Sequence, residues 1–365
     1  MKRILFFALF VFLFCCSPKK IEKNQIVRLG VPVEALSLFD VQKDPFLENF
    51  RIITLKPEER VKNLEVLLFS TKSSAFDGIV VPARTAPVLK EWASFFPSEW
   101  KNEINKDVSS TFSSENGLYA LPLNIDFPVF AYLKEYFDSL QEPKNLGYLR
   151  DDLRHLQRQG KTKGGLVSSV SEEILFLSLL SSERGVPPER FYDYHSIKLM
   201  EFFKEFDLSQ IRIHQVESSL ARGDSVAAFI NLSECFYLSE KLKKQGLTLV
   251  VTSLPSTSKS FSIYNGFCLM GYNFDSGKIK ILKHFIEKDF QKTFLQSGYA
   301  PIINIEKETI PFQNVIQNTN LIGFPFEWEG MNFLKESIRD VLIYGDDPET
   351  SLVRAEARLR NLDKK

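Results

Sequence analysis

The chain has little cysteine and no long hydrophobic run beyond its amino terminus. Only four of its 365 residues are cysteine, and two of those, Cys15 and Cys16, stand near the start. The other two, Cys235 and Cys268, are too few for the disulfide framework of small secreted domains. The sequence is compatible with one disulfide between Cys235 and Cys268 or with two separate buried thiols. No C-x-x-C pair or His and Cys cluster has metal-ligand spacing, so we expect neither a metal nor another cofactor.

The sequence also lacks net charge and local catalytic motifs. Lys and Arg total 46 and Asp and Glu total 46, which argues against the basic surface that a nucleic-acid partner requires. Gly160-Lys161-Thr162 is not a P-loop, because His155 stands where the pattern needs a glycine. Gly223–Ala227 lacks the final glycine of a nucleophile elbow. We therefore expect no enzyme activity, with an exported hydrolase that uses a scattered carboxylate pair as the alternative.

An export signal opens the chain. Lys2 and Arg3 precede an unbroken apolar run from Ile4 to Phe14, and small residues follow it. This order is typical of a secretory signal peptide, here residues 1–15. The run is about half as long as a membrane-spanning helix, so we expect it to be removed rather than kept as an anchor.

The end of this signal resembles a bacterial lipobox, in the run Leu13-Phe14-Cys15-Cys16. The resemblance implies lipid attachment at Cys16, with residues 16–25 as a lipidated amino terminus and tether. The protein would then be exported and anchored to a membrane by its lipid, in the periplasm or at the cell surface. An ordinary signal peptide with incidental cysteines is the alternative.

The body of the chain alternates strand and helix patterns. Short apolar runs between turn residues predict strands, and apolar residues at helical spacing predict helices. A long helical section is expected at residues 144–222, and two helices at the carboxyl end, the last beginning at the cap Asp347-Pro348-Glu349. This order predicts an α/β protein of two lobes, because the chain is also too long for one compact core. The expected strands are 25–31, 50–55, 77–82, 117–123, 127–132, 225–230, 247–251 and 262–272, with a helix at 86–93.

Several segments, taken in order, resemble extracellular solute-binding proteins of the maltose-binding-like group, family 1. The resemblance implies an α/β, two-lobed periplasmic-binding-protein fold with a hinge between the lobes. It divides the chain into residues 26–135, the first part of the N-terminal lobe; 136–255, a helix-rich segment mainly of the C-terminal lobe; and 256–365, returning segments and C-terminal helices. The segments are Asp77–Val81, Asn116–Pro122, Ala131–Phe137, Ala221–Asn231, Leu254-Pro255, Asn265–Phe267, Gly298–Pro301 and Asp347–Leu362.

The resemblance also implies a function and its partners. A monomer would bind a small solute, a carbohydrate above all, between the lobes and deliver it to the permease subunits of an ABC importer. The family often has a sugar-stacking tryptophan after the strand at 225–230, and this chain has none there. Either Phe236 replaces that tryptophan or the ligand is not a sugar. A surface lipoprotein that keeps the fold but binds a host or envelope partner is the alternative function.

Aromatic and hydrogen-bonding side chains are the groups that a sugar site needs, because a sugar ring has apolar faces and a rim of hydroxyls. The same residue types also cap helices, form turns and fill cores, and this is the alternative role for each candidate. The candidate ligand-binding residues are Asn124, Asp126, Asn231, Glu234, Phe236, Tyr264, Asn265 and Trp328.

Overall fold

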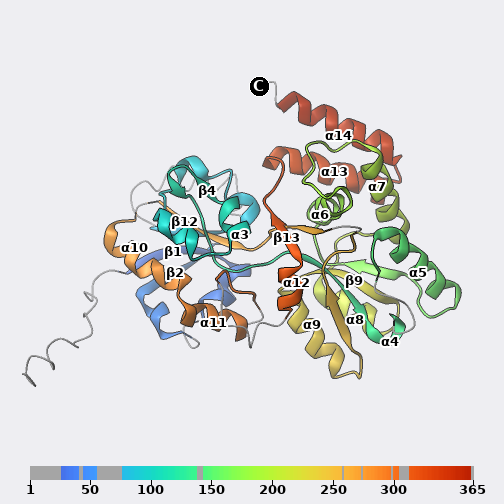
Figure 1. The fold of residues 1–365 in the computed structure, drawn as a ribbon, viewed down its shortest axis with the longest axis horizontal. Helices are drawn as coiled ribbons and strands as arrows, with labels where there is room; N and C mark the ends of the chain where they lie inside the picture. Colours follow the sequence, from blue (N-terminus) through green and yellow to red (C-terminus); the bar gives the residue numbers. More distant parts are fainter. Residues whose placement is uncertain are drawn as a thin grey trace, which may run out of the picture.

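The computed structural model describes residues 26–40, 44–55, 76–137, 143–256, 259–272, 274–296, 299–303 and 312–362. Two α/β lobes lie side by side in it, each built around its own sheet (Figure 1). The signal peptide, Cys16 and the tether lie outside the described residues. Among the described residues, no helix combines the length and the apolar character needed to cross a bilayer.

The first lobe contains a five-stranded sheet. β1 (Val27–Pro32), β2 (Phe50–Leu55) and β3 (Gly78–Pro82) are parallel, and β12 (Phe267–Gly271) runs antiparallel between β3 and β6 (Leu121–Pro122). The strand order is β2-β1-β3-β12-β6. Helices α3 (Lys106–Thr111), α10 (Ser276–Leu282) and α11 (Lys288–Gln296) belong to the same lobe (Figure 1).

The second lobe contains a four-stranded sheet in the order β10-β7-β9-β8. Its strands are β7 (Pro128–Leu133), β8 (Gly165–Ser168), β9 (Ser225–Asn231) and β10 (Leu249–Thr252). The predicted helical section is present as four helices interrupted by β8. These are α5 (Leu146–Arg158), α6 (Glu172–Arg184), α7 (Tyr194–Phe206) and α8 (Ile213–Ala221), and α9 (Glu234–Lys243) follows β9.

Three chain segments cross between the lobes and hydrogen-bond to one another. The first is residues 123–127, the second is residues 264–266, and the third passes through β13 (Thr319–Ile322), which pairs in parallel with β11 (Ser260–Ile263). The first crossing therefore precedes β7, whereas the sequence interpretation placed the end of the first segment at residue 135. β7 is an element of the second sheet because it pairs with β9 and β10.

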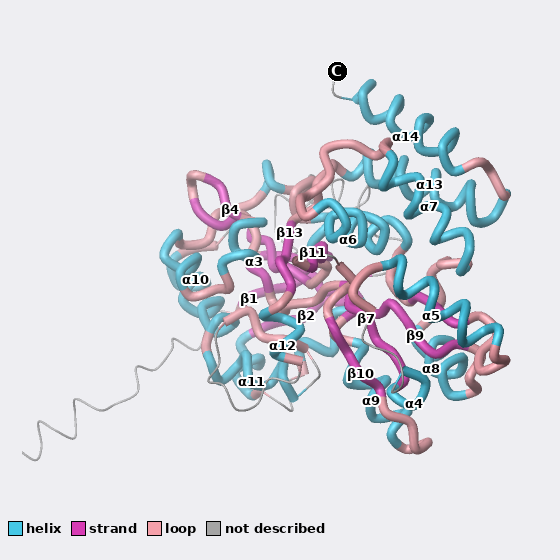
Figure 2. Tube along the Cα trace, turned by 45° about the vertical axis from the view of Figure 1, so that its right-hand side comes forward, coloured by secondary structure: helices cyan, strands magenta, loops and turns pink. Residues whose placement is uncertain are grey.

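The two C-terminal helices return to the second lobe. α13 (Trp328–Tyr344) and α14 (Pro348–Leu362) pack on each other and against α6 and α7 (Figure 2). The predicted cap is confirmed: a carboxylate oxygen of Asp347 accepts hydrogen bonds from the Thr350 backbone N–H at 2.9 Å and from its hydroxyl at 2.8 Å. Leu352 and Ala355 face the core, as their helical spacing predicts.

Three sequence expectations are wrong in detail. The single strand expected at 117–123 is two short strands in different sheets, β5 (Gly117–Leu118) and β6. The segment expected as a helix at 86–93 consists of turns and the 3-10 helix Lys90–Trp92, with a second 3-10 helix, Ala83–Thr85, directly before it. Pro87 lacks the backbone donor that a helix interior requires. The single strand expected at 262–272 is two strands, β11 and β12, separated by the crossing segment 264–266.

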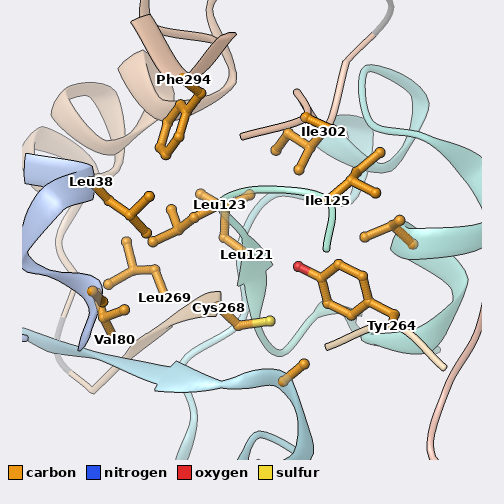
Figure 3. Packing of buried hydrophobic residues seen from close by; sticks show 14 of the residues in the cluster. Leu38, Val80, Leu121, Leu123, Ile125, Tyr264, Cys268, Leu269, Phe294 and Ile302 are labelled. Atoms are coloured by element: carbon orange, nitrogen blue, oxygen red, sulfur yellow. The ribbon is translucent and has the colours of Figure 1, made fainter. Parts of the chain in front are cut away.

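Two hydrophobic cores are present. One fills the first lobe and continues onto one face of the second sheet, and the other lies between the opposite face of that sheet and α5, α6, α7, α13 and α14. Figure 3 shows part of the first one, where Leu121 of β6 and Leu123 of the first crossing meet Leu269 and Cys268 of β12. Both Cys268 and Cys235 are buried free thiols. The two-thiol alternative is therefore the one that the structure has.

Candidate functional site

The carboxyl ends of the parallel strands face the crossing segments in both lobes. In the first lobe, Pro82 at the end of β3 pairs with Phe267, the residue that follows the second crossing. In the second lobe, Asn231 at the end of β9 pairs with Pro128, the residue that follows the first crossing. Ligands of open α/β sheets bind outside these carboxyl ends. The region between the two strand edges, which we call the cleft, is therefore the candidate site.

One group of side chains joins the lobes across this cleft. Arg84, two residues beyond β3, places Nη1 3.5 Å from Oε1 of Glu173 in the first turn of α6. Lys335 of α13 places Nζ 3.6 Å from the other oxygen of Glu173. The Arg84 guanidinium also lies 5.4 Å from the ring centroid of Trp328, the first residue of α13. We call these four residues the Arg84–Glu173 cluster.

Glu173 is the most buried member of the cluster. Its exposed fraction is 4%, and no described residue hydrogen-bonds its Oε2. Two ion pairs beyond 3.4 Å and the amino-terminal end of a helix dipole offset its charge, but a buried carboxylate is stabilised fully only when its oxygens accept hydrogen bonds. Oε2 of Glu173 is therefore a buried acceptor that no described donor satisfies, and it is too enclosed in this form for a ligand to contact.

A second polar group lies where β8 and β9 end. Oε2 of Glu234, in the first turn of α9, accepts hydrogen bonds from the Ser169 hydroxyl at 2.5 Å and the Asn231 N–H at 2.9 Å. Burial raises the pKa of Glu234 above its usual value, against the effect of these hydrogen bonds. The Gln210 side chain donates to the Ser169 carbonyl at 3.0 Å, and its backbone N–H donates to Glu172 at 3.0 Å. Polar side chains thus run continuously from α9 to α6 along this edge.

Asp126 links the first crossing to the second lobe by hydrogen bonds. Its carboxylate accepts hydrogen bonds from the Ser233 N–H at 3.0 Å, the Ser233 hydroxyl at 2.7 Å and the Phe127 N–H at 3.1 Å. Burial raises the pKa of Asp126 to about 7, and the nearby charge of Glu234 acts in the same direction. Its backbone carbonyl accepts from the Asn265 N–H at 2.8 Å. These contacts favour a hinge role for Asp126.

Asn124 and Tyr264 link the first two crossings and are fully buried. The Tyr264 hydroxyl donates to the Asn124 carbonyl at 2.7 Å, and the Asn124 side-chain oxygen accepts from the Phe267 N–H at 3.0 Å. Gly266 permits this close approach, because a Cβ there would lie 2.5 Å from the Asn124 carbonyl oxygen. The environment favours a structural role for both side chains.

The other predicted site residues are half-buried and lie in two places. Asn265 contacts Asn231, with 3.5 Å between Nδ2 and Oδ1, so the second crossing meets the Glu234 group. Phe236 of α9 packs edge-on against Phe312 with 5.3 Å between ring centroids. Trp328 is in the Arg84–Glu173 cluster. The predicted set is thus divided among the hinge, the end of β9 and the start of α13.

Sequence reasoning missed Arg84, Glu173 and Lys335. Each stands in a different element and in no recognisable motif, so only the folded chain brings them together. The position of Arg84 directly after a predicted buried strand was the one available signal. Among the described residues, no group of three or more His, Cys, Asp or Glu side chains could hold a metal ion.

No protein-family model matches the sequence, and no curated protein matches it in sequence. Solved structures do match the fold. The GacH receptor of Streptomyces glaucescens, solved unliganded and with acarbose, matches with a TM-score of 0.73 and 13% identity over 93% of this chain and 98% of that chain. The sugar-binding protein MalE of Xanthomonas citri matches with a TM-score of 0.72 and 13% identity over 92% of this chain and 97% of that chain.

An ABC transporter solute-binding protein of Agrobacterium radiobacter K84, in complex with ribitol, has a TM-score of 0.72 and 15% identity over 93% of this chain and 99% of that chain. At such low identity the likeness shows the fold. The chain therefore has the two-lobed α/β fold of ABC-importer solute-binding proteins, as the resemblance in its sequence implied.

Proposed function

We propose that the protein is a non-enzymatic carrier that binds a small extracytoplasmic solute in the cleft and delivers it to an ABC permease. The observation that carries the proposal is the Arg84–Glu173 cluster at facing strand ends of two lobes that three hydrogen-bonded segments connect. Such connections allow lobes to close over a ligand by hinge motion. A closed form of this kind is what a permease would receive.

A carbohydrate or polyol is the solute class that the side chains favour. Trp328 offers a half-buried, flat aromatic face beside the Arg84 guanidinium. Asn231 and Gln210 add amide groups along the same edge. One aromatic face with a few placed hydrogen-bonding groups suits a ring with apolar faces and a rim of hydroxyls. The solved structures of the same fold that contain acarbose or ribitol support this class.

A binding screen tests this proposal. Protein freed of bound ligand is heated with sugars, polyols and amino acids, and isothermal titration calorimetry follows for each solute that raises Tm. We expect a sugar or polyol to raise Tm, because a ligand that binds only the folded state stabilises it by mass action. If no solute raises Tm, the proposal is contradicted.

A pair of tryptophan variants tests the location of the site. Trp328→Ala removes the stacking face and should weaken binding of that solute by about ten-fold or more. Trp92→Ala is the matched control, because Trp92 is 38% exposed on the first lobe and is not a member of the cluster. If Trp328→Ala and Trp92→Ala bind the solute with equal affinity, Trp328 is not part of the binding site.

A surface lipoprotein that binds a host or envelope protein is the second candidate. It is favoured by the segment after β9, where a glutamate, Glu234, is held in internal hydrogen bonds and Phe236 packs on Phe312. A solute that binds in the screen and whose uptake stops on deletion of the gene would exclude this candidate.

A further inference from the structure

A pocket on the second lobe opens beside the Arg84–Glu173 cluster. Its volume is about 340 Å³, which lies within the range of small-molecule sites. It is formed by the first turn of α6, the segment before α8 and one face of α13, and both views show α6 and α13 next to each other. The lining residues are Glu172, Ser209, Gln210, Lys335, Arg339, Leu342 and Ile343.

Lys335 makes this pocket continuous with the cleft. Its side chain lines the pocket, and its Nζ lies 3.6 Å from Glu173, which in turn contacts Arg84 of the first lobe. Gln210 also lines the pocket, and its side-chain amide donates a hydrogen bond to the Ser169 carbonyl at the edge of the second sheet. Trp328, Glu173 and the pocket therefore all belong to the second lobe.

The pocket has a surplus of positive charge. Lys335 and Arg339 are four residues apart on α13, so they project from the same face of the helix. Arg339 is exposed, and no other described residue forms an ion pair with it. The one lining carboxylate, Glu172, accepts a hydrogen bond from the Gln210 N–H and stands in the first turn of α6, where the helix dipole offsets its charge.

The neighbouring groups add to this surplus. In the Arg84–Glu173 cluster two cations share one carboxylate, at 3.5 and 3.6 Å. Beside the pocket, the Asp207 carboxylate accepts a hydrogen bond from the lining residue Ser209 at 2.9 Å. The cleft acids Asp126 and Glu234 are held in internal hydrogen bonds and their pKa values are raised by burial. They therefore repel an incoming anion less than two exposed carboxylates would.

We propose that this pocket is an anion-binding subsite of the cleft, and that the ligand is a sugar with a negatively charged substituent, a carboxylate or a phosphate. Its acidic group would pair with Arg339 and Lys335, and a chain of sugar rings would extend from there toward Trp328, because Arg339 lies about 16 Å beyond Trp328 along α13. A guanidinium binds the two oxygens of such a group through parallel hydrogen bonds. The side chains of Leu342 and Ile343 line the same pocket and form its apolar part. This inference rests on the proposed function and narrows its ligand class.

The test compares acidic sugars with their neutral counterparts by isothermal titration calorimetry. Trigalacturonate is paired with its methyl ester, and glucose 6-phosphate with glucose, so that each pair differs in charge and the two pairs distinguish carboxylate from phosphate. At least one acidic member should bind about ten-fold more tightly than its neutral counterpart, and the difference should decrease as salt increases.

Two variants make the test specific to the pocket. Arg339→Gln should reduce the affinity for the acidic member about ten-fold and leave the neutral member unchanged. Arg158→Gln is the matched control, because Arg158 is an exposed arginine in the last turn of α5 and is not a lining residue.

The outcomes separate this inference from the proposed function. The subsite is overturned if neutral sugars bind as tightly as the acidic ones. It is also overturned if Arg339→Gln and Arg158→Gln have the same affinity for the acidic sugar. In either case the proposed function remains, with a neutral sugar as the ligand. A screen in which sugars, polyols and both acidic probes fail to bind would overturn the proposed function and the subsite together.

Discussion

Asp126 makes the stability of the folded protein depend on pH. Its carboxyl has a pKa of about 7 in the folded protein because it is buried, whereas an exposed aspartate titrates near 4. Between these two values the unfolded chain has released the proton and the folded chain retains it. Stability therefore decreases as pH rises from about 4 to about 7 and stays level above that range.

Asp126→Asn tests this coupling. The amide oxygen can still accept from the Ser233 N–H, but the proton equilibrium is lost. We expect a weaker decrease of Tm between pH 5 and pH 8 than in the native protein. Asp289→Asn, a change at a carboxylate that is 93% exposed, should leave the slope as it is. An unchanged slope in Asp126→Asn would show that another group is responsible.

Gly266 holds the two crossings at their close distance. In Gly266→Ala the added Cβ would lie 2.5 Å from the Asn124 carbonyl oxygen and 2.6 Å from the Tyr264 hydroxyl. The segments must move apart, so we expect the free energy of unfolding to decrease by about 2 kcal/mol or more in urea titrations. Gly147→Ala in the first turn of α5 adds the same methyl group, which would meet only the Asn145 side chain at 3.2 Å, and should change stability by less than about 1 kcal/mol.

At the scale of single elements, the last helix depends on its cap. Asp347→Ala removes the acceptor of two hydrogen bonds from Thr350, and should lower the free energy of unfolding by about 1 kcal/mol. Asp347→Asn keeps an acceptor oxygen and should recover most of that loss. Equal destabilisation by both changes in urea unfolding would assign the effect to charge rather than to the cap.

The elements also show which local patterns are reliable guides. β3 and β9 are short apolar runs between turn residues, and both form at the predicted places because each is buried on both faces of its sheet. The segment after β3 has helical apolar spacing at Leu89 and Trp92, yet it forms turns and 3-10 helices. Pro82 and Pro87 limit the backbone there, and packing of Leu89 into the core needs no complete helix.

At the scale of the whole molecule, the predicted lipid anchor concerns residues outside those that the structure describes. A lipid at Cys16 would hold the folded body at the membrane, where the proposed function requires it. Cys16→Ser should release the protein from membranes into the soluble fraction, because no lipid could be attached. Affinity for the solute should stay the same, since the cleft lies in the folded body. A wild-type protein without lipid, in the same fraction as the variant, would refute the lipobox prediction.

The sequence by itself determined the α/β class and most of the strands and helices, because burial of one face or both faces imposes runs and periodicities within about ten residues. The two lobes were expected from the length of the chain and from the resemblance to solute-binding proteins. The sequence also indicated the polar residues at the end of β9, because Asn231 and Glu234 stand directly after a readable strand.

Only the tertiary structure decided what those side chains do. Asn124, Asp126 and Tyr264 carry the residue types of a binding site, but the crossing segments bury them and use their polar atoms to hold the hinge. Arg84, Glu173 and Lys335 form the contact between the lobes, although no local pattern marks them. The reason is physical: a site between two lobes is formed by residues far apart in the chain, and their chemistry depends on burial and on partners that folding supplies.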